Sequence, residues 1–488
     1  MLARQSSTLP EHRKASRWYG GGVTALGLHG PVKPKRFEEV LSGRIPGTKT
    51  RLGRLREGKH EHRPGLDITF SAPKSVSLEA LVQAQPKTGA KIIRAHDEAV
   101  KATLDFIEDE LLQTRSWDPL TRKRPRVKAH GLVAATFRHY ASRNLDPQLH
   151  THSVVANMTQ NAEGAWRSAD FIRIERSKLL IGAFYRSELK RRIEALGYAT
   201  TQTMVGSVPG FEIAGYTREH LKAFSTRREE ALRWAKERNL DASASVMQQA
   251  VLYTRKRKEE PSRSELARLW KQRTGELSLE RDWHTARGRS AATRDGGRDD
   301  LAAPRLDRDR WNLRHRARQE EQQHPSPLFA VRRAVEHLEE RKTVFSAAML
   351  RALVLASGRW SLPEIDGAIA KLVADGHLIE ARAHRSDRAF VTDRAVKAER
   401  SVLAWMKANR GVGGSGVPPG LLEVALEDGP LNAGQKDAVR MLLLPGDRLV
   451  GVQGHAVIPT QDYGINAERV VMPSDEREPA RHRSFSAL

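Results

Sequence analysis

Three histidines, His139, His150 and His152, stand close together in the sequence and could hold one metal ion. His150 and His152 are two residues apart in LHTHSVV, and side chains two apart on a strand share a face at a spacing of about 6.5–7 Å. Neutral imidazoles bind zinc, copper, iron, nickel and, more weakly, manganese. Three protein ligands leave positions open for water or a substrate oxygen. The alternative is that these are ordinary surface or core histidines, and their spacing alone names no reaction.

The segments that carry these histidines are expected to be two paired strands. GLVAATFRHY and LHTHSVVANMTQ are rich in β-forming residues, and the link between them, ASRNLDPQ, is typical of a turn. A turn of this length can bring His139 beside the other two. Upstream, LDITFSA alternates, which places Leu66 and Ile68 on one face of a strand and Asp67 on the other.

Helices are expected on both sides of these strands in the sequence. Residues 90–113 have helical periodicity, and His96 is the one polar interruption of the apolar side. Residues 176–198 form a second predicted helix, which ends at Gly197. Strands mixed with helices in this way predict an α+β fold over residues 1–285, with an antiparallel sheet covered by helices.

The charge of the chain points to a polyanionic partner. The net charge is +24, and basic clusters begin at Lys33, Lys49, Arg122 and Arg255. Repeated clusters separated by structured sequence favour a groove that follows phosphates, so nucleic acid is the expected partner. An anionic membrane surface is the alternative, and the sequence lacks the strongly amphipathic basic helix that it would need.

Composition also limits the location and the type of site. The chain has no cysteine, which excludes disulfides and thiolate-bound zinc. No apolar run approaches the roughly 18 residues of a membrane span, so no membrane insertion is expected. The first residues lack the apolar stretch of a signal peptide, and the expected location is cytoplasmic.

The rest of the chain divides by composition. Residues 286–327 are charged and punctuated by Gly and Pro, which predicts a linker. Residues 328–410 read as three helices followed by two short strands, the order of a winged-helix module. Such modules contact DNA or serve only for packing, and both readings stay open. Residues 411–456 form a further segment, and residues 457–488 have few apolar positions and are predicted to be a disordered tail.

Two long segments resemble a known family. HRPGLDITFSAPKSVS, from His62, and FRHYASRNLDPQLHTHSVVANMTQ, from Phe137, are similar to the MobF class of conjugative relaxases, the TrwC/TraI-type members of the HUH endonucleases. The resemblance extends upstream to WYGGGVTALGLHGPV and downstream through GAFYRSELKRRIEALGY, so it covers residues 18–285. It implies that the predicted sheet and helices form an HUH relaxase domain.

The resemblance implies a reaction and a metal. Family members nick one strand at a plasmid transfer origin, where a tyrosine attacks the phosphate and stays joined to the 5′ end. The three histidines would hold a divalent ion (Mg, Mn, Zn or Ni) that polarises this phosphate. Asp67 would orient a ligand histidine and help the tyrosine to lose its proton.

The resemblance also implies binding partners. Single-stranded DNA at the transfer origin is the substrate, and Arg63 and Lys74, which flank Asp67, could contact its phosphates. Accessory relaxosome proteins and a coupling protein are further implied partners.

The expected nucleophile is the first departure from the family pattern. The family's tyrosines lie upstream of the block that begins here at Trp18, and the preceding residues, MLARQSSTLPEHRKASR, contain none. Tyr19 is the only tyrosine before Tyr140, and it lies after the place where the nucleophile belongs. Gly21 also replaces the usual lysine of the block. We therefore expect impaired nicking.

The helicase segment is the second departure. LNAGQKDAV resembles the start of a superfamily 1 helicase, in which Gln435 would read adenine. A phosphate-binding loop would continue from Gly454 as G-x-x-x-x-G-K-[ST], but the sequence gives GHAVIPTQ. Since the second glycine, the lysine and the Ser/Thr are missing, the nucleotide site is read as vestigial and no ATP use is expected. A truncated or frameshifted reading frame is the expected cause.

Three hypotheses about function remain open. The first is a relaxase that nicks and rejoins transfer-origin DNA. The second is a non-catalytic, metal-containing remnant that binds single-stranded DNA. The third, less favoured, is a transcriptional regulator that uses the winged-helix-like unit.

Overall fold

The computed structural model describes residues 16–205, 208–241, 243–254, 261–276, 326–340, 342–381, 388–409, 418–427, 431, 433–443, 449–452 and 470–473. Nearly all of the predicted linker lies outside these residues, as does the predicted phosphate-binding loop after Gly454. Four residues of the predicted disordered tail form strand β18 (Val470–Pro473), which pairs with β17 (Leu449–Val452). The rest of this tail lies outside the described residues, and its disorder stays a prediction.

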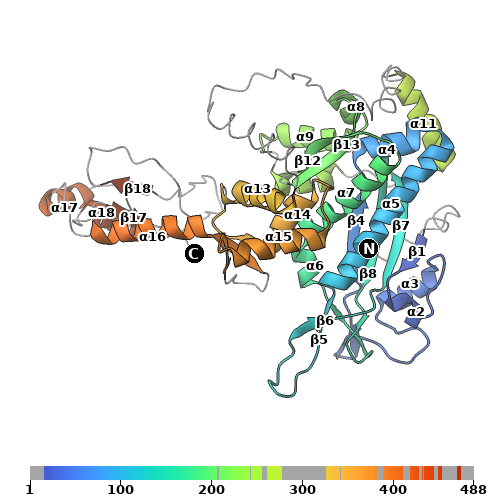
Figure 1. The fold of residues 1–488 in the computed structure, drawn as a ribbon, viewed down its shortest axis with the longest axis horizontal. Helices are drawn as coiled ribbons and strands as arrows, with labels where there is room; N and C mark the ends of the chain where they lie inside the picture. Colours follow the sequence, from blue (N-terminus) through green and yellow to red (C-terminus); the bar gives the residue numbers. More distant parts are fainter. Residues whose placement is uncertain are drawn as a thin grey trace. The chain divides into compact units, whose positions relative to one another are not determined.

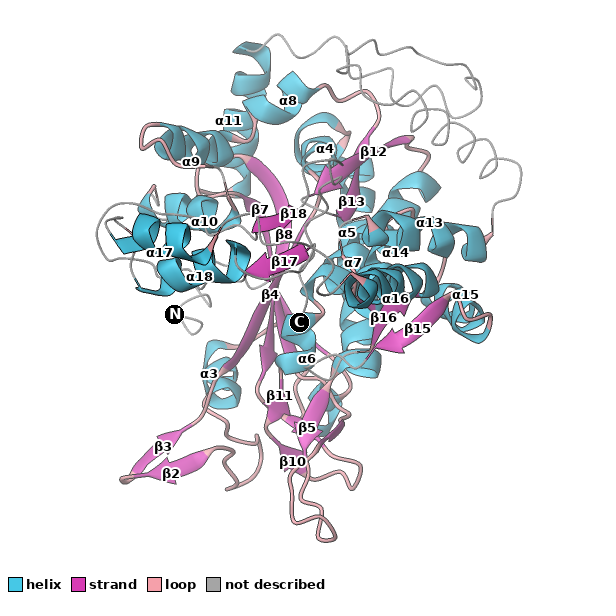
Figure 2. Ribbon diagram, turned by 90° about the vertical axis from the view of Figure 1, so that its left-hand side faces the viewer, coloured by secondary structure: helices cyan, strands magenta, loops and turns pink. Residues whose placement is uncertain are grey.

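A four-stranded antiparallel sheet forms the centre of the first part of the chain (Figures 1 and 2). Its order is β1-β7-β8-β4, with β1 at Ser16–Tyr19, β7 at Ala134–Ala141, β8 at Pro147–Ala156 and β4 at Gly65–Ser71. The predicted pairing of the two histidine-bearing segments is confirmed, because β7 and β8 pair antiparallel across the turn at residues 142–146. The α+β class with an antiparallel sheet is also confirmed.

Two helices cover one face of this sheet. α5 (Pro86–Phe106) and α7 (Lys178–Ala195) lie side by side against it (Figure 1). The ring of Tyr185 on α7 packs against Phe70 of β4, with the ring centroids 5.3 Å apart. Burial of these apolar side chains is the main force that holds the two layers together.

The other face is covered over part of its length by α3 (Pro34–Leu41). Phe37 is fully buried there, and its ring meets Phe137 of β7 edge-on at 5.3 Å. Val154 of β8 joins the same apolar cluster. This packing lies beside the histidine-bearing ends of β7 and β8, which carry polar side chains on the same face.

Smaller elements surround the two ends of the sheet. Figures 1 and 2 show the β2–β3 and β5–β6 hairpins at one end and α8, α9 and α11 at the other. The hairpins and short strands are β2 Arg54–Arg56, β3 Lys59–Glu61, β5 Gln113–Arg115, β6 Arg126–Lys128, β9 Thr159–Gln160, β10 Trp166–Arg167, β11 Ala169–Asp170, β12 Thr200–Val205 and β13 Val208–Ile213. The further helices are α2 Gly22–Ala25, α4 Lys74–Leu78, α6 Ile172–Arg176, α8 Arg218–Ala223, α9 Thr226–Lys236, α10 Ala244–Tyr253 and α11 Arg263–Glu276, with π-helical turns at Glu79–Gln83 and Ile107–Leu111.

Further elements follow in the later part of the chain. They are α13 Pro327–Glu339, β14 Phe345–Ser346, α14 Ala347–Leu355, α15 Leu362–Ala374, β15 Leu378–Ala381, β16 Ala389–Thr392, α16 Asp393–Ala408, α17 Pro419–Glu427 and α18 Ala433–Leu443. Three helices and two later strands are thus present, and the winged-helix and helicase assignments stay predictions.

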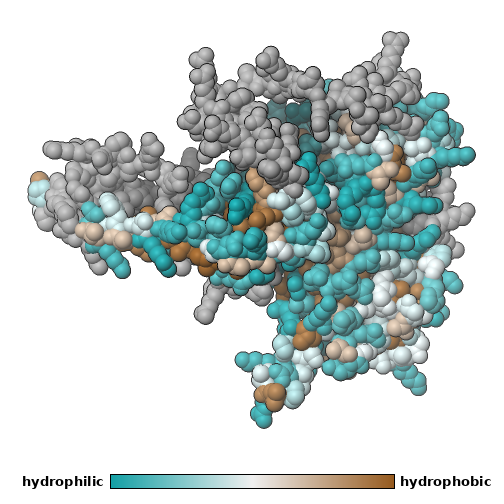
Figure 3. All heavy atoms as spheres, in the orientation of Figure 1, coloured by the Kyte–Doolittle hydropathy of each residue, from teal (hydrophilic) through white to brown (hydrophobic). Residues whose placement is uncertain are grey.

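The chain forms two compact units, Met1–Ala374 with Glu380–Phe390, and Asp375–Ile379 with Val391–Leu488. Among the described helices, none is both long enough and apolar enough to cross a membrane. Hydrophilic side chains predominate on the face shown in Figure 3.

Candidate metal centre

The structure brings the three histidines together on one face of the sheet. His139 pairs directly with His150, and His152 pairs with Phe137, so all three side chains project to the same side. The ring centroids are 5.3 Å apart for His139 and His150, 5.4 Å for His139 and His152, and 5.3 Å for His150 and His152. The three imidazoles therefore form a nearly equilateral triangle.

This triangle has the spacing that a shared ion requires. An imidazole nitrogen bonds zinc at about 2.0–2.1 Å, which puts the ring centre roughly 3.2 Å from the ion and the centres of three tetrahedrally arranged rings about 5.2 Å apart. Within the described residues, however, no group of three histidine or acidic side chains forms a preformed metal cluster. The spacing of the rings is thus the observation that supports a metal site, and metal binding by these histidines stays a prediction.

The hydrogen bonds of two rings leave one nitrogen of each for a metal. His150 Nδ1 lies 2.9 Å from the carbonyl oxygen of Gln148. His152 Nδ1 lies 3.0 Å and 3.2 Å from the two carboxylate oxygens of Asp67. If each Nδ1 carries the proton and donates it, the lone pair stays on Nε2, which is the form that a metal ligand needs.

Burial keeps the His150 ring neutral. Desolvation lowers the pKa of His150 to about 4, and the neighbouring His152 and Lys74 act in the same direction. Its bond to the Gln148 carbonyl opposes this shift. At neutral pH the ring is therefore a neutral donor, and metal binding does not have to displace a proton from it.

Asp67 lies where the sequence placed it, beside a histidine of the triangle. It belongs to β4, opposite Val154 of β8, and its carboxylate contacts His152 Nδ1. Thr69, two residues further on, places its hydroxyl 3.1 Å from the same Nδ1 and was not singled out from the sequence. The signal was present, because strand alternation puts Asp67 and Thr69 on one face.

The two predicted phosphate-binding residues have protein partners. Arg63 forms an ion pair of 2.9 Å with Glu175, and its guanidinium lies over the ring of Phe171. Lys74 donates from Nζ to the carbonyl oxygen of Pro147, at 3.0 Å. Burial lowers the pKa of Lys74. Lys74 thus holds the start of the histidine strand, and a DNA contact by either residue stays a prediction.

Tyr19 lies away from the histidines. It pairs with Ala134, five residues before His139 on β7, which corresponds to about 17 Å along the strand. Its hydroxyl donates to Asp105 Oδ1 at 2.6 Å, and burial together with Asp105 raises its pKa well above the usual range. A phenol in this position is hard to deprotonate and is not brought to the site.

The first residue of β1 is the one nearest the histidines. Ser16 pairs with Phe137 and Tyr19 with Ala134, so β1 runs antiparallel to β7 with its first residue nearest His139. The last predicted site residue, Gln435, lies in α18 of the other compact unit.

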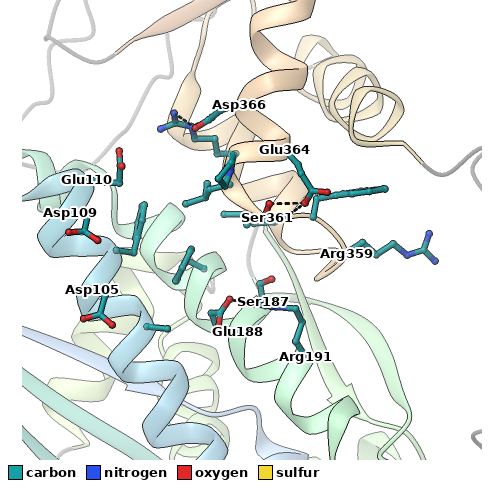
Figure 4. Close-up of a pocket in the computed structure, with 18 residues that line it drawn as sticks. Asp105, Asp109, Glu110, Ser187, Glu188, Arg191, Arg359, Ser361, Glu364 and Asp366 are labelled. Atoms are coloured by element: carbon teal, nitrogen blue, oxygen red, sulfur yellow. Dashed lines mark hydrogen bonds and ion pairs between the residues drawn. The ribbon is translucent and has the colours of Figure 1, made fainter.

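Two cavities accompany the site in the first unit. One, of about 940 Å³, lies on the opposite face of β7, and its walls include Thr151 and more basic than acidic side chains: Arg17, Arg94, Lys101, Arg138 and Arg263 against Asp97 and Glu98. The other, of about 620 Å³, lies between the end of α5, the middle of α7 and the start of α15 (Figure 4). Its walls include Asp109 and Arg359, and none of the three histidines lines it.

The first part of this chain is similar to known proteins. The family model described as TrwC relaxase matches residues 6–277. The multifunctional conjugation protein TraI of Escherichia coli is 38% identical over 252 residues, which are 50% of this chain and 13% of TraI. The chain thus spans about an eighth of the length of that relative.

Solved structures of TrwC show the same likeness. The metal-free conjugative relaxase TrwC in complex with OriT DNA is 37% identical with a TM-score of 0.51, over 57% of this chain and 95% of that chain. A metal-bound structure of TrwC with OriT DNA is 38% identical with a TM-score of 0.49, over 54% and 89%.

Proposed function

Because the chain belongs to the TrwC relaxase family, we propose that it binds single-stranded DNA at a plasmid transfer origin and positions one phosphodiester over His139, His150 and His152 for nicking. The observation that carries this proposal is the triangle of imidazoles on a sheet face, with Asp67 directly behind one of them. Binding of OriT DNA by the TrwC relaxase supports the choice of substrate.

The histidines are proposed to hold a divalent metal ion, with Mg, Mn, Zn and Ni as candidates. When bound, such an ion polarises a phosphoryl oxygen and stabilises the charge that develops on it. Asp67 accepts the Nδ1 proton of His152 and fixes both its tautomer and its ring angle. The Gln148 carbonyl does the same for His150. The cations of the 940 Å³ cavity, on the opposite face of β7, would attract a separate stretch of the phosphate backbone.

Strand transfer also needs a nucleophile. A tyrosine hydroxyl would bond to phosphorus, its proton would leave, and the 3′ oxygen of the cleaved strand would depart as a hydroxyl. The nucleophile must be held in line at about 3–3.5 Å from phosphorus. Tyr19 is bound to Asp105 at the far end of β7, so we propose that these 488 residues perform the transfer poorly.

A denaturing gel tests this part of the proposal. We expect no covalent adduct when the protein is incubated with manganese and a labelled oligonucleotide that carries the cognate nick site. A band shifted by the mass of the protein, and lost in Tyr19→Phe, would contradict the expectation and identify Tyr19 as the nucleophile. A shortened oligonucleotide without an adduct would indicate metal-dependent hydrolysis instead.

The second candidate function is a metal-containing protein that binds single-stranded DNA without turnover. The position of Tyr19 is the observation that favours it. Oligonucleotide binding with no adduct and no shortened product is the outcome that it predicts. ATP use is not part of either proposal, and relaxosome proteins and a coupling protein stay predicted partners.

A further inference from the structure

A buried hydrogen-bonded relay lies behind the histidine strand, on the face covered by helices. His96 of α5 is fully buried, with its Nδ1 2.7 Å from the hydroxyl of Tyr185 and its Nε2 2.8 Å from the hydroxyl of Thr151. Tyr185 lies on α7, and Thr151 is the residue between His150 and His152 on β8. The relay therefore connects α5 and α7 to Thr151, the residue between His150 and His152.

We propose that His96 is a positioning residue for the metal centre, which acts through Thr151; this inference rests on the proposed metal-binding function. Successive side chains of a strand point to opposite faces, so a bond that holds Thr151 from behind also sets the direction of its two neighbours in front. Both imidazole nitrogens of His96 are hydrogen-bonded in either tautomer. The ring is therefore held between Tyr185 and Thr151, and it fixes the position of the Thr151 hydroxyl.

Nonpolar packing alone does not account for this histidine. The side chains one helical turn from it on α5, Ile92, Ile93, Ala99 and Val100, are all apolar and buried. A leucine at position 96 would continue this apolar side without the cost of burying two ring nitrogens. On the strand side, the His96 ring bonds to a single residue, Thr151. Thr151 lies between His150 and His152, two of the three proposed ligands.

The experiment measures Co²⁺ binding to the full chain without DNA, by titration calorimetry and by the visible absorption of the bound ion. We expect His96→Leu and Thr151→Val each to weaken Co²⁺ binding about tenfold and to change the absorption bands, since changes to supporting partners of metal ligands typically cost 10–100-fold in affinity. The double variant should be no weaker than either single one, because both remove the same link. His96→Gln, which can donate and accept, should restore most of the affinity.

Val100→Ala is the matched control, because it removes buried atoms one turn from His96 on the same helix and leaves the hydrogen-bonding atoms of His96, Tyr185 and Thr151 in place. It should leave the affinity within twofold of the wild-type value. Unchanged affinity in Thr151→Val, or an equal loss in Val100→Ala, would overturn the inference while the wild-type protein still binds Co²⁺. Absence of binding in the wild-type protein would overturn the metal centre itself and, with it, the inference.

Discussion

At the scale of single residues, burial sets the charge of the histidines in and behind the site, because it lowers the pKa of both His96 and His150. Desolvation lowers the pKa of His96 to about 3, and Arg138 and His150 add to this shift. His96 therefore stays neutral in the folded protein over the whole range in which an exposed histidine becomes charged.

This shift predicts a loss of stability in acid. Between pH 6.5 and about pH 3 the unfolded chain binds a proton at His96 that the folded protein does not, so the free energy of unfolding falls as the pH falls. The contribution of His96 is on the order of 2 kcal/mol at pH 5. Urea denaturation at pH 7 and pH 5 should show a smaller difference in His96→Leu than in the wild-type protein. The same difference in both would show that His96 does not titrate in this way.

At the scale of elements, the turn between the two histidine strands is held by helices from later in the sequence. Asp146 is almost completely buried and accepts hydrogen bonds from Arg273 at 3.0 Å and from Thr226 at 2.8 Å. Trp270 donates from Nε1 to the carbonyl oxygen of Leu145, at 2.7 Å. Thus α9 and α11 fix the turn that sets the register of His139 against His150.

Replacement of Asp146 should therefore be costly. Asp146→Asn breaks an ion pair with Arg273 in which the Asp146 side chain is only 1% exposed, and we expect a loss of about 2–3 kcal/mol in the free energy of unfolding. Asp366→Asn is the control, because it breaks a bidentate pair with Arg351 in which the Asp366 side chain is 40% exposed. It should cost at most about 1 kcal/mol. Equal losses in the two variants, measured by urea denaturation, would argue against a special role for the buried turn.

The sequence predicted local features of this region well and its supporting contacts poorly. Strand alternation placed Asp67 on the polar side of β4, and the i, i+2 spacing placed His150 and His152 on one face, because both follow from backbone geometry alone. The contacts of Asp146 with Thr226 and Arg273, and of His96 with Thr151, join residues far apart in the sequence. No periodicity marks such pairs. Thr69 is intermediate, since its face was predictable and its contact with His152 was not.

At the scale of the whole molecule, the basic charge should appear as salt-sensitive DNA binding. Each phosphate contact with single-stranded DNA contributes roughly 0.7 to the slope of log affinity against log salt, so five cations predict about a hundredfold loss between 50 and 200 mM salt. The five basic side chains in the wall of the 940 Å³ cavity are the proposed source. Fluorescence anisotropy with a labelled oligonucleotide measures this slope.

A pair of double variants locates the contacts. Arg94→Ala with Lys101→Ala should lower the slope by about 1.4, since two phosphate contacts are removed. Arg400→Ala with Lys407→Ala, two exposed positions on α16, should leave it unchanged. The reverse result would place the DNA on the later part of the chain and would favour the regulator hypothesis.

The central claim is that His139, His150 and His152 hold one divalent metal ion. Its most direct test is the metal content per chain after equilibration with Mn²⁺ or Zn²⁺ and dialysis, compared between wild-type protein, His150→Ala, His152→Ala and the exposed control His29→Ala. We predict about one ion per chain in the wild-type protein and in His29→Ala, and loss of most of that metal in the other two. Metal content that stays the same in both His150→Ala and His152→Ala would contradict the account.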